Sequence, residues 1–142
     1  IYNMDSASKK KIIITSCLDQ IFQLFDDILR IIPNDSDIMA AKVYVTGIKQ
    51  ANPKLIITSW HNTVTLKYKA QIDKGDYDFA INKDYNSDIT NHCEKNSSDF
   101  KYFEKIIEKI RDIVKKLNDD DRQKLIKYVQ NISNLTTLYF DN

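Results

Sequence analysis

The stretch 52-NPKLIITSWHNTVTLKYKAQIDKGDYDF-79 decides the fold, because it holds a helix start signal, a helix stop signal and the one tryptophan of the chain. Asn52 can cap a first helical turn, and Pro53 suits the first helical position, where a missing N–H costs nothing. Gly75 can take the left-handed conformation that ends a helix. Between these ends an apolar residue recurs every four positions, at Ile56, Trp60, Val64, Tyr68 and Ile72. This stripe predicts a long central helix, about 52–74.

Two further helices are predicted upstream. Apolar residues at three-and-four spacing predict a first long helix, about 14–32, which Pro33 ends because the residue before proline avoids the helical region. A second helix, about 36–51, follows the capping side chains of residues 34–37. Its Gly47 costs about 1 kcal/mol relative to alanine. Either the helix is distorted at Gly47, or another backbone packs closely against it.

The remaining chain completes an all-α, single-domain helical bundle of five to six helices. A short helical turn after Gly75 and a polar loop over 83–98 precede a fifth helix, about 99–117, and a sixth, about 120–139. Asn118 is a plausible left-handed turn residue between these two, so they are expected to form a C-terminal antiparallel helical hairpin. Residues 1–11 are predicted to be a flexible N-terminal arm, and 12–140 the helical domain. The predicted core includes Trp60, Tyr68, Ile107, Ile110 and Ile132.

Composition excludes several classes of protein. The 142 residues are 42% hydrophobic and 29% charged with a formal net charge of +1, as in globular domains. The apolar runs are far shorter than the ~20 residues that a membrane-spanning helix needs, so no membrane partner is expected. Eighteen of the 21 basic residues are lysine. Nucleic acid is disfavoured as a partner, because phosphate binding needs a concentrated basic excess and base reading favours arginine.

Residues that carry chemistry are sparse. Two glycines in the whole chain are too few for a phosphate-binding loop, so no nucleotide cofactor is expected. His61, His92, Cys17 and Cys93 are suitable zinc ligands but lack the short paired spacings of zinc sites. No disulfide framework is visible, and a reducing compartment is favoured. A small hydrolase that uses Cys93 or His61 is kept as an unlikely alternative. No catalytic, metal or cofactor residue is therefore predicted.

The segment after the central helix is the predicted docking site for a partner. It concentrates aromatic and acidic side chains beside a polar loop, and this is the composition of an interface core with its rim. The candidate docking residues are Asp76, Tyr77, Asp78, Phe79, Asp84 and Tyr85. The competing interpretation is that Tyr77 and Phe79 close the bottom of the bundle.

From Asn52 to Tyr85 the sequence resembles an uncharacterised group of small proteins from giant nucleocytoplasmic large DNA viruses of the mimivirus kind. That group shares an Asn-Pro pair followed by tryptophan, tyrosine and isoleucine, and then Gly-Asp, aromatics and Asp-Tyr. The matching positions here are Asn52, Pro53, Trp60, Tyr68, Ile72, Gly75, Asp76, Phe79, Asp84 and Tyr85. Ala80 departs from the pattern, because a second aromatic is common there. The likeness covers about Phe22 to Tyr139 and implies a viral origin without an assigned activity.

These observations together predict a non-enzymatic viral protein that acts as a protein–protein interaction or structural module. Its partner is expected to be a viral or host protein, or a second copy of the chain, in the host cytoplasm or the virion. The alternative is a nucleic-acid-binding protein that uses the arm residues Lys9, Lys10 and Lys11 together with a lysine-bearing helix face.

Overall fold

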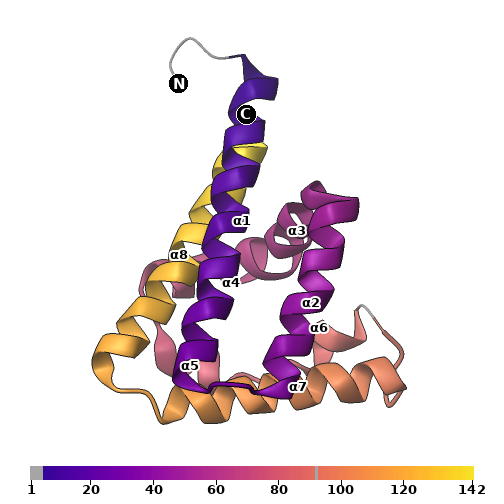
Figure 1. Ribbon diagram of the computed structural model, residues 1–142, viewed down its shortest axis with the longest axis vertical. Coiled ribbons are helices and arrows are strands. Elements are labelled where there is room, and N and C mark those ends of the chain that lie inside the picture. Colours follow the sequence, from indigo (N-terminus) through magenta and orange to yellow (C-terminus); the bar gives the residue numbers. More distant parts are fainter. Residues whose placement is uncertain (1–4, 92) are drawn as a thin grey trace.

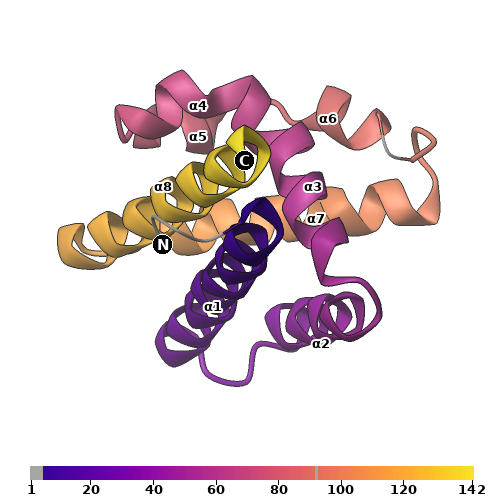
Figure 2. The same ribbon diagram turned by 90° about the horizontal axis from the view of Figure 1, so that it is seen from above.

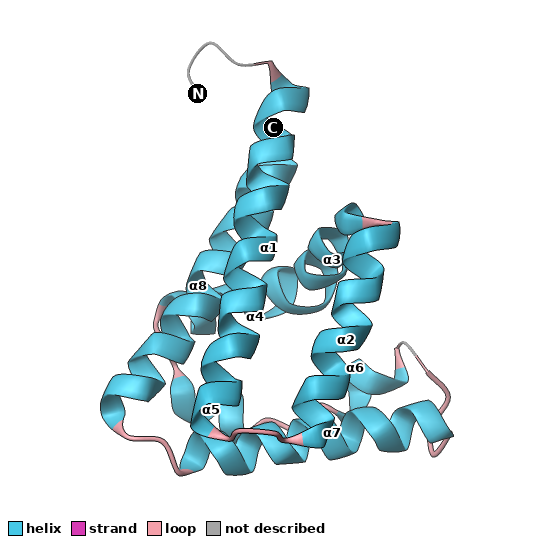
Figure 3. Cartoon of the chain, viewed as in Figure 1, coloured by secondary structure: helices cyan, strands magenta, loops and turns pink. Residues whose placement is uncertain are grey.

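The computed structural model describes residues 5–91 and 93–142, and the described part is helices joined by short loops, without any strand (Figure 1, Figure 3). The elements are α1 (Ser6–Ile31), α2 (Ser36–Ala51), α3 (Pro53–Trp60), the π-helical segment η1 (His61–Thr65), α4 (Leu66–Asp73), α5 (Tyr77–Asn82), α6 (Asn86–Thr90), α7 (Ser98–Lys115) and α8 (Asp119–Asp141). The predicted all-α class is confirmed. Because α3, η1 and α4 are continuous, the described chain has seven separate helices, and α6 is the one that was not predicted.

The first helix begins earlier than predicted. Asp5 caps α1 by accepting a 2.7 Å hydrogen bond from the Ser8 N–H, so residues 6–11 are helical and the expected flexible arm is wrong over that range. The other end of the chain helps to hold this turn, since the Ser6 hydroxyl donates to the Asn142 carbonyl at 2.8 Å. Residues 1–4 of the expected arm lie outside the described part.

The central helix runs from Pro53 to Asp73, as predicted, but it contains a π-helical turn. Within η1 the Leu66 N–H donates to the carbonyl of His61, five residues back, instead of four. Gly75 ends the helix in the left-handed conformation with φ of 64°, as expected. Asn52 differs from the expectation, because its side chain makes no capping hydrogen bond.

Helix α8 packs antiparallel along α1, and not along α7 as the predicted hairpin required (Figure 1). Hydrogen bonds join the two helices from Tyr128 to Asp27 at 2.5 Å and from Asn131 to Gln20 at 3.1 Å. The reason lies at Asn118, which is extended rather than left-handed and caps α8 by accepting from the Asp121 N–H at 2.8 Å. This extended residue directs α8 away from α7, which crosses the base of the molecule.

The buried core lies between α1, α3 and α8. It consists of Ile13, Cys17, Ile21, Ile57, Ile132 and Tyr139, with Trp60 packed against it. Of the predicted core residues, Ile132 is fully buried, while Trp60, Tyr68 and Ile107 are half-buried. Ile110 is 40% exposed, so its assignment to the core is wrong. The cause is again the position of α7, whose apolar face is not covered by α8.

Helix α2 lies at the edge of the molecule. Seen from above, α1 and α3 flank it on its inner side, and its outer side has no neighbour among the described residues (Figure 2). No helix in the described part of the chain is both long and apolar enough to cross a membrane.

Candidate interaction surface

The aromatic residues of the predicted docking segment point into the molecule. The Tyr77 hydroxyl donates to the Val114 carbonyl at 2.5 Å, and the Arg122 guanidinium lies 4.9 Å from the centre of the Tyr77 ring. Phe79 and Tyr85 pack on Tyr68, with ring centroids 6.0 and 6.3 Å apart. All three docking aromatics are half-buried and tie α5 and the following loop to α4 and α7. This arrangement supports the interpretation that they close one side of the bundle.

The acidic residues of the segment also have local structural roles. Asp76 caps α5 by accepting from the Phe79 N–H at 3.0 Å, and Asp84 accepts from the Asn86 N–H at 2.9 Å. Asp78 is exposed in the first turn of α5, where the helix dipole favours negative charge. The aromatic side chains of this segment already have contacts within the chain. Docking of a partner at this segment stays a prediction.

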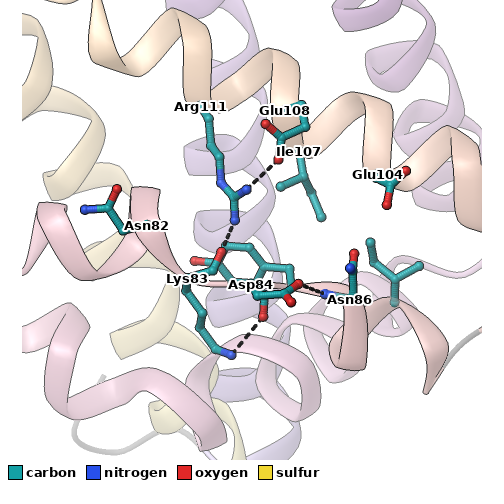
Figure 4. A pocket seen from close by; sticks show the side chains of 10 residues that line it. Asn82, Lys83, Asp84, Asn86, Glu104, Ile107, Glu108 and Arg111 are labelled. Atoms are coloured by element: carbon teal, nitrogen blue, oxygen red, sulfur yellow. Dashed lines mark hydrogen bonds and ion pairs between the residues drawn. The ribbon is translucent and has the colours of Figure 1, made fainter.

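A pocket of about 390 Å³ lies between this segment and α7 (Figure 4). Arg111 reaches from α7 to the Lys83 carbonyl and also pairs with Glu108, while the Lys83 ammonium donates to the Asp84 carbonyl at 3.2 Å. The charged residues of the lining are the basic Lys83 and Arg111 and the acidic Asp84, Glu104 and Glu108.

Asp88 on α6 is a half-buried anchor that the sequence did not reveal. Its carboxylate accepts hydrogen bonds from Lys67 and from the Tyr68 hydroxyl, both at 2.7 Å. Burial alone would raise the pKa of Asp88, but the bonds from Lys67 and Tyr68 outweigh it and lower the pKa. Burial and the bond to Asp88 together raise the pKa of Tyr68. The contact holds α6 onto α4, so its role is structural.

The candidate hydrolase residues have separate surroundings. The Cys93 thiol donates to the Ile89 carbonyl at 3.3 Å, whereas His61 stacks on Phe140 at 4.3 Å and lies 3.3 Å from the Thr136 hydroxyl. Cys17 is fully buried, and burial raises the pKa of its thiol to about 12, which keeps it protonated and unreactive. His92 lies outside the described residues. Within the described part, no three metal-ligating side chains come together.

The lysines of the alternative nucleic-acid reading lie within α1. Lys9 and Lys10 are half-buried, and the Lys10 ammonium sits 5.0 Å from the centre of the Tyr139 ring. A flexible basic arm could follow a phosphate backbone, but these three lysines are held on a helix, and Lys10 also packs against an aromatic ring.

The outer face of α2 carries exposed apolar and small side chains. It consists of Met39, Ala40, Val43, Tyr44 and Gly47, here called the α2 outer face. Met39 is 46%, Val43 71% and Tyr44 66% exposed. None of its five residues is charged, and exposed apolar patches of this kind mark interaction sites.

The charged residues of α2 all point elsewhere and have partners within the chain. Asp37 pairs with Lys109 at 2.6 Å, and Lys42 pairs with Asp26 at 2.6 Å. The Lys49 ammonium lies 4.8 Å from the centre of the Phe22 ring. Together with the buried Ile38, these contacts fix which side of α2 faces inward. The rotation of the helix, and with it the exposure of the outer face, is therefore firmly set.

Gly47 has no structural explanation among residues 5–91 and 93–142. Helix α2 continues through it from Ser36 to Ala51, so no distortion requires a glycine. A side chain added there would meet nothing within 4 Å, so no backbone among the described residues packs against it. Neither of the two explanations that the sequence suggested is therefore seen in the described part of the chain.

No protein-family model, no curated protein and no solved structure matches this chain.

Proposed function

We propose that this protein is a non-enzymatic protein–protein interaction module that uses the α2 outer face as its contact surface. The observation that carries the proposal is Gly47, which destabilises an exposed helix by about 1 kcal/mol relative to alanine. No atom of the described residues would stand in the way of a side chain there. A helix or loop of a partner that packs closely on α2 would account for both the glycine and the apolar residues around it.

The resemblance to small proteins of giant DNA viruses supports a viral origin. A viral interaction module of this size would work in the host cytoplasm or in the virion. The internal pairing of charges in the pocket beside α7 and the separate surroundings of His61 and Cys93 favour this reading over a hydrolase. The helical setting of Lys9 and Lys10 favours it over a nucleic-acid-binding arm.

Site-specific photo-cross-linking tests the proposal. A photoreactive phenylalanine analogue replaces Val43 in one variant, and Leu66 in a control, because Leu66 is 67% exposed on α4 and so matches the 71% exposure of Val43. Irradiation in host cells is expected to give discrete protein adducts from position 43 and none from position 66. Adducts of equal yield from both positions, or none from position 43, would contradict the proposed function.

A further inference from the structure

We propose that the occupant of the α2 outer face is a second copy of this chain, packed antiparallel on α2 about a twofold axis between Val43 and Tyr44. This inference rests on the proposed function and names its partner. The argument comes from the order of large and small residues along the helix, from charge and from exposed area.

The α2 outer face is self-complementary in its spacing. A twofold axis midway between Val43 and Tyr44 places Ala40 opposite Gly47 of the second copy, and Gly47 opposite Ala40. Beyond these, Ser36 meets Ala51, both at the ends of α2 and both small. Small residues face small residues on both sides of the axis, so two α2 helices can approach closely on either side of the central Val43 and Tyr44. An interface formed by the same patch on both copies needs this symmetry.

The bulky residues fit the same arrangement. Val43 and Tyr44 are the most exposed side chains of the face and lie at its centre, where each meets the other residue type of the second copy. A large flat ring packed across a branched side chain buries apolar area on both sides. Because Ala40 and Gly47 flank them, the space for these large side chains is already present on the opposite helix.

Charge favours a second copy as well. In a twofold interface built from the same patch on both chains, a charged residue near the axis lies close to the same residue of the second copy. The repulsion between these like charges costs free energy. The α2 outer face has no charged residue, and two of the three charged residues of α2 form ion pairs within the chain, Asp37 with Lys109 and Lys42 with Asp26. Two copies therefore meet without repulsion, whereas a partner with a charged surface would find no complement here.

The exposed area of the chain leaves room for such an interface. The chain exposes 8867 Å², while a folded monomer of its 16.6 kDa is expected to expose about 7,600 Å². A standard interface removes about 800 Å² from each partner, and a small one less. A dimer through α2 would bring the exposed area toward the normal range.

Sedimentation velocity at protein concentrations between about 1 and about 500 µM tests the dimer. A small interface is expected to give a dissociation constant of roughly 1–100 µM. The mass is expected to rise from 16.6 kDa toward twice that value with concentration. Val43→Lys should remain at the monomer mass, and the matched control Leu66→Lys should behave like the parent. A monomer at all concentrations would overturn the second copy as occupant. It would leave the proposed function standing if position 43 still cross-linked to a different protein.

Gly47→Ala separates a role in the dimer from a role in the monomer. In dilute monomer it should raise Tm by about 2–4 °C, since alanine favours helix and meets no atom within 4 Å. The same methyl group would separate the two helices and should weaken the dimer at least about fivefold. A higher Tm with unchanged dimer affinity would overturn the pairing about Gly47.

Disulfide trapping tests the register. In a Cys93→Ser background, a mixture of Ser36→Cys and Ala51→Cys chains should oxidise to a mixed dimer faster than either chain alone. The reason is that the proposed pairing puts residue 36 of one copy opposite residue 51 of the other. Faster cross-linking of either variant with itself would overturn the antiparallel register.

Discussion

Ser133 and Thr136 place two hydroxyl groups on the buried side of α8, where they meet the central helix. The Trp60 indole N–H donates to the Ser133 hydroxyl at 3.1 Å, and the Thr136 and Thr65 hydroxyls are 2.8 Å apart. Ser133, Thr136 and Thr65 are almost completely buried. Buried polar groups are costly unless paired, so these bonds also specify how α8 docks on the central helix.

Trp60→Phe is expected to reduce the free energy of unfolding by about 1–2 kcal/mol, because it removes the N–H donor while keeping an aromatic ring. Trp60→Ala should cost about 3 kcal/mol, because it also removes the packing against the core. Urea unfolding measures both changes. A double-mutant cycle with Ser133→Ala should show a coupling near about 1 kcal/mol, and independent effects would contradict the hydrogen bond.

Asp35 and Asp37 clamp the start of α2 to α7. Asp35 caps α2 through the N–H groups of Asp37 and Ile38, and its other oxygen accepts from Lys109 at 2.9 Å. The hydrogen bond from Lys109 is the main cause that lowers the pKa of both carboxyl groups below their ordinary value of 3.8. Hydrogen bonds to Asp37 and Asp35 raise the pKa of Lys109 in turn.

This clamp predicts an acid-sensitive contribution to stability. Carboxyl groups with a lowered pKa in the folded state stabilise it fully above the unfolded value of 3.8, and that stability is lost as the pH falls through the lower folded values. Lys109→Met should therefore flatten the loss of stability below 3.8, measured as the urea midpoint against pH. Lys95→Met, at an exposed loop position, is the control. Parallel curves for the parent and Lys109→Met would contradict the clamp.

At the scale of elements, the π-helical segment explains the spacing of the central helix. Each step of four residues advances about 40° beyond a full α-helical turn, so a long four-residue repeat winds around an ordinary helix. The extra residue in η1 takes up part of this rotation. It brings Thr65 into the core instead of the expected Val64, and it keeps Tyr68 directed toward Asp88. The four-residue spacing of apolar residues from Ile56 to Ile72 is thus consistent with a π-helical turn within the central helix.

Deleting Asn62, an exposed residue of η1, should rotate α4 by about 100° relative to α3. Tyr68 would leave Asp88, and the free energy of unfolding should fall by roughly 2–4 kcal/mol. Ultraviolet titration should show the pKa of Tyr68 returning toward its ordinary value of 10.0. Asn62→Ala keeps the chain length and serves as the control. A deletion variant that keeps both its stability and its raised tyrosine pKa would show that η1 does not set the direction of α4.

The sequence predicts a feature of these elements well where neighbouring residues determine it, and poorly where contacts between distant parts of the chain determine it. The C-terminal ends of α1 and of the central helix follow from nearby residues, Pro33 and Gly75 respectively. The partner of α8 depends on the backbone conformation of Asn118, which sequence pattern does not determine. The α2 outer face was not predicted, because only the structure shows that the described part of the chain leaves these apolar residues uncovered. The aromatics of the docking segment were recognised, whereas their inward direction depends on contacts with α4 and α7.

At the scale of the whole molecule, the protection of backbone amides from hydrogen exchange is expected to be uneven. The buried residues concentrate where α1, α3 and α8 meet, while α5 has no buried residue and α6 only one. Native-state hydrogen exchange should therefore be slowest around Ile13–Ile21 and Ile132–Tyr139, and fastest from residue 83 to residue 97. Mass spectrometry of peptic fragments measures this order. Equal exchange in both regions would contradict a core confined to these helices.

The pairing of α1 with α8 also sets when the protein can fold during its synthesis. The two hydrogen bonds between these helices join residues that are separated in the sequence by 101 and by 111 positions. At a translation rate of about 5–20 residues per second, α1 waits roughly 5–20 s before its partner is made. During that time its apolar face has no cover, which is the condition under which chaperones bind nascent chains. A ribosome stalled before α8 would therefore hold a chain that cannot close its core.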